Sequence, residues 1–159
     1  MLKKSQLLKY AVDYLSKYNS SKKNLVRIIK SKIIRISSNE LEKKHLFSAI
    51  SYVVEELEKN NLLNDQIFAQ NKIFSLAERG KSKNFIFNYL VNKGIDKSII
   101  ENILDDFHYN NNNWEKNSAI IFAKKNKLFD KNKDFQKKLG KMSRAGFSYE
   151  LSKEILKED

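Results

Sequence analysis

Residues 93–107 read KGIDKSIIENILDDF, and residues 145–159 read AGFSYELSKEILKED. Each segment has the same plan: a glycine, an apolar residue, an aspartate or serine, and then apolar residues at helical spacing. Glycine suits the left-handed residue that ends a helix, and the oxygen of an aspartate or serine side chain accepts an N–H from the first turn of the next helix. Both segments therefore predict a helix–turn–helix corner, at Gly94 and at Gly146.

A weaker third copy of this pattern lies upstream. Residues 50, 53, 54 and 57 (Ile, Val, Val and Leu) align with Ile100, Ile103, Leu104 and Phe107. A spacing of about 50 residues that holds about three helices indicates tandem three-helix repeats. We place these repeats at residues 1–60, 61–108 and 114–159. Because one such unit cannot bury its own apolar stripe, neighbouring repeats should share a core, and we expect an elongated array.

Apolar residues recur every three or four positions along most of the chain, which is the spacing of helices with one buried face. The stripes cover residues 7–18, 25–33, 46–57, 68–77, 85–90 and 99–107. No segment shows the sustained alternation of a strand. The chain has no Pro and only four Gly, which disfavours turn-rich all-β folds. The sequence predicts an all-α fold.

Candidate helix ends agree with the stripes. The side chains expected to cap helix N-termini are Ser20 or Ser21, Asp65, Ser82, Asp96 and Ser148. Gly80, Gly94 and Gly146 are expected to end helices. Residues 35–40 should form a longer polar connector, and residues 109–113, with four consecutive Asn, a flexible joint.

The composition indicates a basic protein that is suited to bind polyanions and that has no cysteine chemistry. The chain has 31 Lys and Arg against 19 Asp and Glu, a formal charge of +12. This surplus favours association with polyanions, although a solvated Lys-rich surface without a polyanionic partner gives the same count. The absence of Cys excludes disulfides, iron–sulfur clusters and a thiol nucleophile. No run of 18 apolar residues occurs, so we expect no membrane span and a cytoplasmic location.

Catalytic and metal-binding patterns find little support. His45 and His108 lie far apart, and one histidine does not make a metal site. The acidic pairs at 55–56 and 105–106 are adjacent, so on a helix their side chains diverge by about 100° and cannot share a metal ion. We therefore predict no enzyme activity, no metal and no cofactor.

The segment Gly80-Lys81-Ser82 ends like a phosphate-binding loop, but Ser75 stands where the first glycine would be, and the lead-in is helical. Helix capping by Ser82 is the better interpretation. The N–H groups at the start of this helix, beside Lys81 and Lys83, nevertheless form the best local candidate for binding an acidic group. Most aromatic residues lie on the apolar stripes, so core packing is favoured over base stacking. They include Phe68, Phe85, Tyr89, Phe107, Phe122 and Phe135.

Several motifs together resemble the RecX family, the bacterial regulators of the RecA recombinase. They are Glu55-Glu56-Leu57 with Leu62-Leu63-Asn64-Asp65; Asp65-Gln66-Ile67-Phe68-Ala69; Arg79-Gly80-Lys81-Ser82-Lys83; Ile86, Leu90 and Lys93-Gly94-Ile95-Asp96; and Gly146-Phe147-Ser148-Tyr149-Glu150. The resemblance runs from about Leu8 to Leu156 and is most specific in the middle third. Three positions depart from the family: residues 33–38 lack its Lys-Gly-Phe turn, Asn61 replaces a common Gly, and Ala145 replaces a frequent basic residue.

The resemblance implies three tandem three-helix repeats and a protein that binds RecA–DNA filaments. It also implies inhibition of RecA ATPase, strand exchange and filament growth, and thus a role in recombination and DNA repair. An alternative is a sequence-nonspecific nucleic-acid-binding helical protein without a filament partner. Single- or double-stranded DNA is a candidate ligand, and we expect a monomer. The basic residues expected to contact the filament or phosphates are Lys72, Arg79, Lys81, Lys83, Lys93, Lys124, Lys125, Lys137, Lys138, Lys141 and Arg144.

Overall fold

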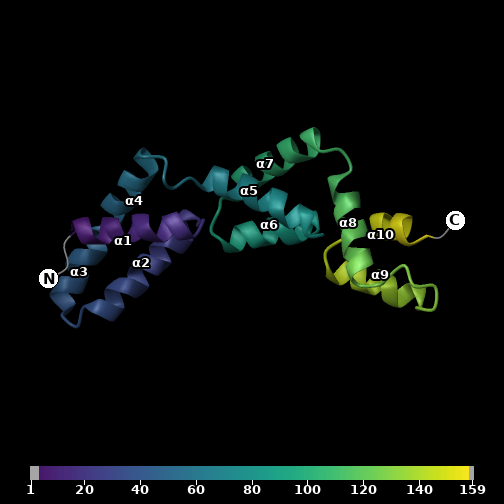
Figure 1. Cartoon of the computed structure of the whole chain (residues 1–159), viewed down its shortest axis with the longest axis horizontal. Helices are drawn as coiled ribbons and strands as arrows, with labels where there is room; N and C mark the ends of the chain where they lie inside the picture. The colour runs from purple at the N-terminus through teal and green to yellow at the C-terminus, as the bar shows by residue number, and fades with distance from the viewer. Residues whose placement is uncertain (1–3, 158–159) are drawn as a thin grey trace. The chain divides into compact units, whose positions relative to one another are not determined.

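The computed structural model describes residues 4–157, and within that range all regular secondary structure is α-helical (Figure 1). The elements are α1 (Lys4–Lys17), α2 (Lys22–Ile36), α3 (Glu40–Ser48), α4 (Ile50–Lys59), α5 (Asp65–Glu78), α6 (Lys83–Asn92), α7 (Lys97–Asn110), α8 (Trp114–Lys125), α9 (Phe135–Arg144) and α10 (Tyr149–Leu156). The predicted all-α fold is confirmed. The chain divides into two compact units: Met1–Phe68 with Lys93–Ile95, and Ala69–Asn92 with Asp96–Asp159.

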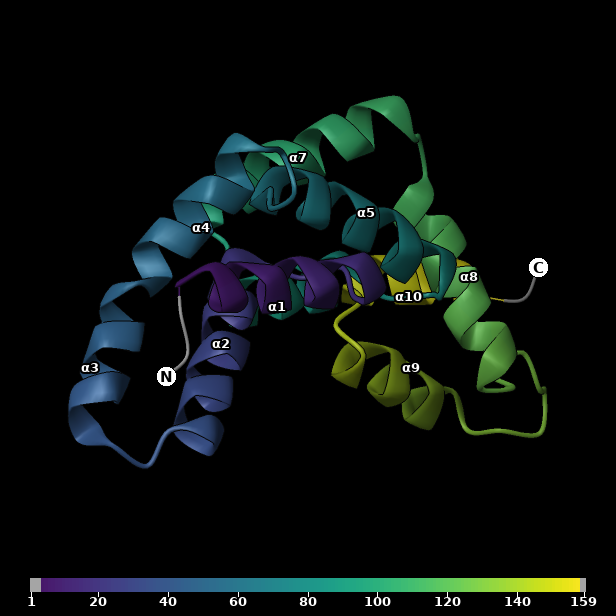
Figure 2. The same ribbon diagram turned by 60° about the vertical axis from the view of Figure 1, so that its left-hand side comes forward.

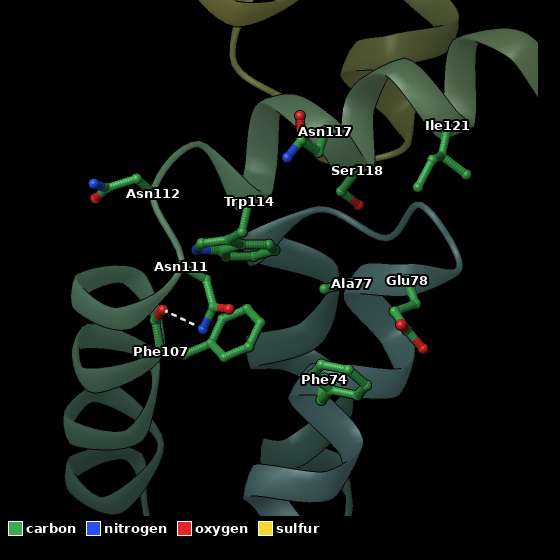
Figure 3. A pocket seen from close by; sticks show the side chains of 10 residues that line it. All are labelled: Phe74, Ala77, Glu78, Phe107, Asn111, Asn112, Trp114, Asn117, Ser118 and Ile121. Carbon is green, nitrogen blue, oxygen red and sulfur yellow. Dashed lines mark hydrogen bonds between the residues drawn. The ribbon is translucent and has the colours of Figure 1, made fainter.

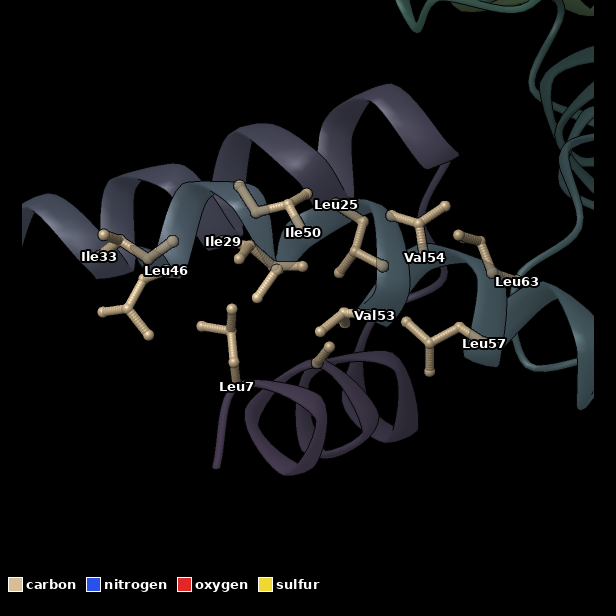
Figure 4. Packing of buried hydrophobic residues seen from close by; sticks show 12 residues of the cluster. Leu7, Leu25, Ile29, Ile33, Leu46, Ile50, Val53, Val54, Leu57 and Leu63 are labelled. Atoms are coloured by element: carbon tan, nitrogen blue, oxygen red, sulfur yellow. The ribbon is translucent and has the colours of Figure 1, made fainter. Parts of the chain in front are cut away.

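In the first unit, α1 packs against α2 and α4, and α2 also packs against α3 and α4. Figure 4 shows Leu7 of α1 pointing toward Ile29 of α2 and Val53 of α4. All three side chains are fully buried. Full burial of such a side chain contributes about 1.5–3 kcal/mol, so the shared core stabilises these short helices more than their intrinsic propensity does.

The apolar stripe over residues 46–57 does not form one continuous helix. The chain bends at Ala49, between α3 and α4 (Figure 2). The Ala49 N–H donates to Leu46 O, three residues back, and the Ser48 hydroxyl donates to His45 O. Serine hydroxyls that bond to the preceding turn compete with the backbone ladder and bend helices. Residues 4–59 therefore hold four helices, where the repeat pattern predicted three.

In the second unit, α6 packs against α7, and α10 packs against both α8 and α9. The α8–α10 core contains Ala119, Leu139, Met142 and Leu156, with Phe147 packed against Phe122 at 5.6 Å between ring centroids. Aromatic pairs at this separation add a modest stabilisation beyond the area that they bury. This core fixes the α9–α10 corner predicted at Gly146.

The structure confirms most predicted helix ends. The Oγ atoms of Ser21, Ser82 and Ser148 accept N–H groups from the first turns of α2, α6 and α10. Asp65 is wrong as an N-cap, because the amide oxygen of Asn64 accepts the first-turn N–H groups of α5. Asp96 precedes α7 without a side-chain capping bond.

Some other boundaries differ from the sequence-based expectation. Tyr18, assigned to the first apolar stripe, lies beyond the end of α1 and is 57% exposed. Helices α2 and α7 extend into the expected connectors at 35–40 and 109–113, ending at Ile36 and Asn110. At the end of α7, the side-chain amides of Asn110 and Asn111 donate to the carbonyls of Asp106 and Phe107, four residues back, so these asparagines cover the last turn of the helix instead of interrupting it earlier.

The Gly146 turn generates the first prediction. Gly146 has φ +94°, and a Cβ atom there would lie 2.5 Å from the Ser82 Oγ. Gly146→Ala should therefore lower the free energy of unfolding by about 2 kcal/mol or more. Gly140→Ala is the matched control: its Cβ would meet only the flexible Arg144 side chain, within α9, so it should raise stability by about 0.5–1 kcal/mol. Urea unfolding measures both, and equal effects of the two variants would contradict this description of the turn.

Candidate partner-binding site

The structure distributes the predicted basic residues over several elements. Lys72 lies on α5; Arg79 and Lys81 lie in the turn after it; Lys83 begins α6; Lys93 follows α6; Lys124 and Lys125 end α8; and Lys137, Lys138, Lys141 and Arg144 lie on α9. Lys93 belongs to the first compact unit and the others to the second. Binding roles for these residues stay a prediction.

The structure brings part of this set together where α8 crosses the α5–α6 turn. The Lys125 ammonium donates to Arg79 O at 3.1 Å, and the Ser118 hydroxyl donates to Lys81 O at 2.6 Å. A Cβ atom on Gly80 would lie 3.0 Å from the backbone of Phe122, so the turn approaches α8 very closely. Arg79, Lys81 and Lys125 therefore form a local cluster of positive charge, which we call the basic turn.

Lys138 differs from the other basic residues of α9. Its side chain is only 6% exposed, whereas Lys137, Lys141 and Arg144 are exposed. The helical spacing explains the difference, because Lys138 shares the inward face of α9 with Leu139 and Met142. Lys138 therefore offers little surface to a partner.

The N-terminus of α6, expected to be open to an acidic group, is occupied by this chain's own side chains. The Ser82 Oγ accepts the Phe85 N–H, and the Lys83 N–H donates to Glu115 Oε1 at 3.0 Å. The Ser82 hydroxyl also donates to Ala145 O at 2.7 Å, which places the α9–α10 turn against the helix end. The positive end of α6 therefore serves the fold.

The same arrangement occurs at α2 in the first unit. The Ser21 hydroxyl donates to Lys93 O at 2.7 Å and accepts the Asn24 N–H, while the Lys22 N–H donates to Asp65 Oδ1 at 2.8 Å. In both places the carbonyl that accepts the serine hydroxyl belongs to the residue just before a left-handed glycine, Gly94 or Gly146. We call this arrangement the serine joint. Its carboxylates, Asp65 and Glu115, were not recognised in the sequence because their separations from Lys22 and Lys83 differ.

A cleft beside Trp114 lies between α5, α7 and α8 (Figure 3). It has a volume of about 280 Å³, and the buried Trp114 indole packs edge-on against Phe107 at 5.4 Å between ring centroids. Trp114 is the first residue of α8, and its burial against Phe107 anchors the start of this helix to α7. Phe74 and Ala77 of α5 line the opposite wall, so the cleft is mainly apolar.

A second hollow, the α6 groove, has a volume of about 370 Å³. It is lined by Asn84, Phe85, Asn88, Tyr89, Asn92, Arg144, Ala145 and Gly146. Phe85 and Tyr89 were assigned to the core because they continue an apolar stripe, but Phe85 is 39% exposed and both line the groove. Asparagines recur at every fourth position of α6, which marks a polar face beside these rings. This spacing is the sequence signal that could have indicated the groove.

The described residues contain neither a candidate metal site nor a candidate membrane-spanning helix. Within residues 4–157, no group of three or more His, Asp or Glu side chains is placed to hold a metal ion. In the same range, no helix combines the length and the apolar character that crossing a bilayer requires.

The short packed helices define an all-helical protein whose basic and aromatic side chains reach the surface at α6 and its neighbouring turns. By sequence, the chain is similar to the protein named "Regulatory protein RecX" of Myxococcus xanthus (strain DK1622). The two are 27% identical over 154 residues, which covers 92% of this chain and 81% of that protein. No family model matches the chain.

The fold is also similar to solved structures. One is described as "Crystal structure of regulatory protein RecX", with a TM-score of 0.73, 21% identity, and coverage of 98% of this chain and 72% of that one. Another is RecX from Lactobacillus salivarius, with a TM-score of 0.67, 21% identity, and coverage of 96% and 94%. The resemblance to the RecX family stated from the sequence is confirmed.

The serine joint generates a second prediction. Ser82→Ala removes both the acceptor for the Phe85 N–H and the donor to Ala145 O. We expect the free energy of unfolding to fall by about 1–3 kcal/mol. Ser98→Ala, at an exposed position in the first turn of α7, should change it by less than about 0.5 kcal/mol. Thermal and urea unfolding check both variants, and a neutral effect of Ser82→Ala would show that the joint does not stabilise the fold.

Proposed function

We propose that this protein binds RecA–DNA filaments and inhibits RecA ATPase, strand exchange and filament growth, thereby modulating recombination and DNA repair. The observation that carries the proposal is the joint similarity of sequence and fold to proteins named RecX. In this proposal the protein acts by binding, as a cytoplasmic monomer, and performs no reaction of its own. The three tandem repeats at 1–60, 61–108 and 114–159 remain the organisation that we propose, supported by the serine joint at both α2 and α6.

The positive charge supplies the physical basis for filament binding. A net charge of +12 accelerates encounter with DNA phosphates or acidic protein surfaces, especially at low salt. Arg79, Lys81 and Lys125 concentrate that charge at the basic turn, whose backbone is held against α8 by hydrogen bonds to the carbonyls of Arg79 and Lys81.

The charge also favours the alternative function, sequence-nonspecific binding of nucleic acid without a filament partner. The two functions differ in what binds most tightly. A filament regulator should bind the assembled filament more strongly than either RecA or DNA at the same salt. A nonspecific binder should bind naked DNA as strongly as the filament, with a slope of log affinity against log salt of about −0.9 per neutralised duplex phosphate.

We expect the protein to inhibit the ATPase of RecA on single-stranded DNA at micromolar concentration. The measurement is steady-state ATP hydrolysis during titration, followed by competition between filament, RecA and DNA at matched salt. No inhibition by protein shown to be folded by circular dichroism would reject the proposed function. Equal affinity for naked DNA and filament would favour the alternative.

Charge reversal tests the basic turn and its neighbour on α6. Changing Arg79, Lys81 and Lys83 together to Glu should weaken filament binding about tenfold or more, because three favourable contacts become repulsive. The matched control changes Lys9, Lys30 and Lys44 to Glu; these are exposed in the first unit, and the net charge falls equally. Equal losses in the two triple variants would show that net charge alone governs binding.

A further inference from the structure

The α6 groove has a composition that the fold does not explain. Asn84, Asn88 and Asn92 stand four residues apart and share one face of α6, and Phe85 and Tyr89 form the adjacent row. Among the described residues, the three asparagine side chains have no hydrogen-bond partner in the fold. Amide groups without a structural task, beside aromatic rings, are suited to contact a ligand that offers both hydrogen-bond donors and acceptors.

The two rings form a partly exposed aromatic surface, with Phe85 exposed and Tyr89 half-buried. Their planes differ by only 18°, and their centroids lie 6.5 Å apart. Phe85 keeps 39% of its surface exposed, although its position on an apolar stripe would allow burial. Near-parallel rings that remain in contact with solvent can stack on other planar groups, and nucleobases stack on such rings with little dependence on sequence.

The charges around the rings are positive. The Lys81 ammonium lies 4.6 Å from the Phe85 ring centroid, and Arg144 lines the groove itself. None of the residues lining the groove carries a carboxylate. The groove thus offers rings for planar bases, amides for base edges and cations for phosphates, which are the three parts of a nucleotide chain.

We propose that the α6 groove binds single-stranded nucleic acid, with bases stacked on Phe85 and Tyr89 and phosphates near Lys81 and Arg144. The positive charges of Lys81 and Arg144 match phosphates, and the row of asparagine amides on α6 matches base edges, so both favour a nucleic-acid strand over a protein segment. A duplex does not fit the same description, because its base faces are already stacked within the helix. The inference rests on the nucleic-acid side of the proposed function. Its binding assays use naked strands without RecA, so the failure of this inference can be distinguished from the failure of the proposed function.

The first test measures fluorescence anisotropy of a labelled 20-nucleotide oligothymidylate and of a 20-base-pair duplex. The variant Phe85→Leu with Tyr89→Leu keeps apolar bulk but removes both rings. We expect about tenfold or greater loss of single-strand affinity, little change for the duplex, and an unchanged salt slope. The control is Tyr109→Leu with Phe129→Leu, two exposed aromatic residues outside the groove, which should leave both affinities unchanged.

Two further variants keep both rings and test the polar and charged groups of the groove. They keep the proposal testable even if the leucine variant does not fold. Asn88→Asp preserves size but places a carboxylate in the groove, and it should weaken single-strand binding several-fold. Arg144→Gln should make the slope of log affinity against log salt shallower by about 0.7, the value for one lost phosphate contact on a single strand.

Two results would overturn the proposal. One is single-strand affinity and salt slope unchanged from the wild type in all three groove variants. The other is unchanged single-strand affinity in the leucine variant together with weaker inhibition of RecA, because the groove would then be a protein-binding surface. Unfolding curves confirm beforehand that each variant is folded.

Discussion

The structure depends on a serine hydroxyl that makes two hydrogen bonds at the start of a helix. At α2 and at α6, this hydroxyl accepts an N–H of the first turn and donates to the carbonyl that precedes a left-handed glycine. A carboxylate, Asp65 or Glu115, takes the first N–H of each helix. Buried polar groups are costly unless they are paired, so these bonds specify where each glycine turn docks, while apolar burial supplies most of the stability.

This use of the helix N-termini shapes where binding can occur. The positive end of α6 is neutralised by Glu115, so the chain's excess positive charge acts through side chains outside the helix end. On one side of α6, α8 holds the basic turn; along the helix itself, the amide row and the rings remain accessible. A fold-stabilising contact and the proposed nucleic-acid-binding groove therefore share one short helix without competing for the same groups.

The sequence predicted the helices well because their apolar spacing and serine caps are local properties. Gly94 and Gly146 marked the corners correctly, since a positive φ needs no knowledge of distant residues. The break at Ala49 and the capping role of Asn64 depended on which side chains bond to the backbone, and the sequence analysis named only the neighbouring Asp65 as a cap. The exposed ring of Phe85 depended on tertiary packing, which a stripe pattern does not contain, whereas the burial of Lys138 follows from its position on the apolar face of α9.

The central claim is that the serine joint closes the starts of α2 and α6, and amide hydrogen exchange tests it most directly. First-turn amides of a helix lack intrahelical partners and normally exchange quickly. We expect marked protection of the Lys22, Asn24, Lys83 and Phe85 amides relative to those of Ser98 and Ile99 in α7, because the Asp96 that precedes α7 makes no side-chain capping bond. Exchange of the four joint amides as fast as that of the α7 pair would contradict it.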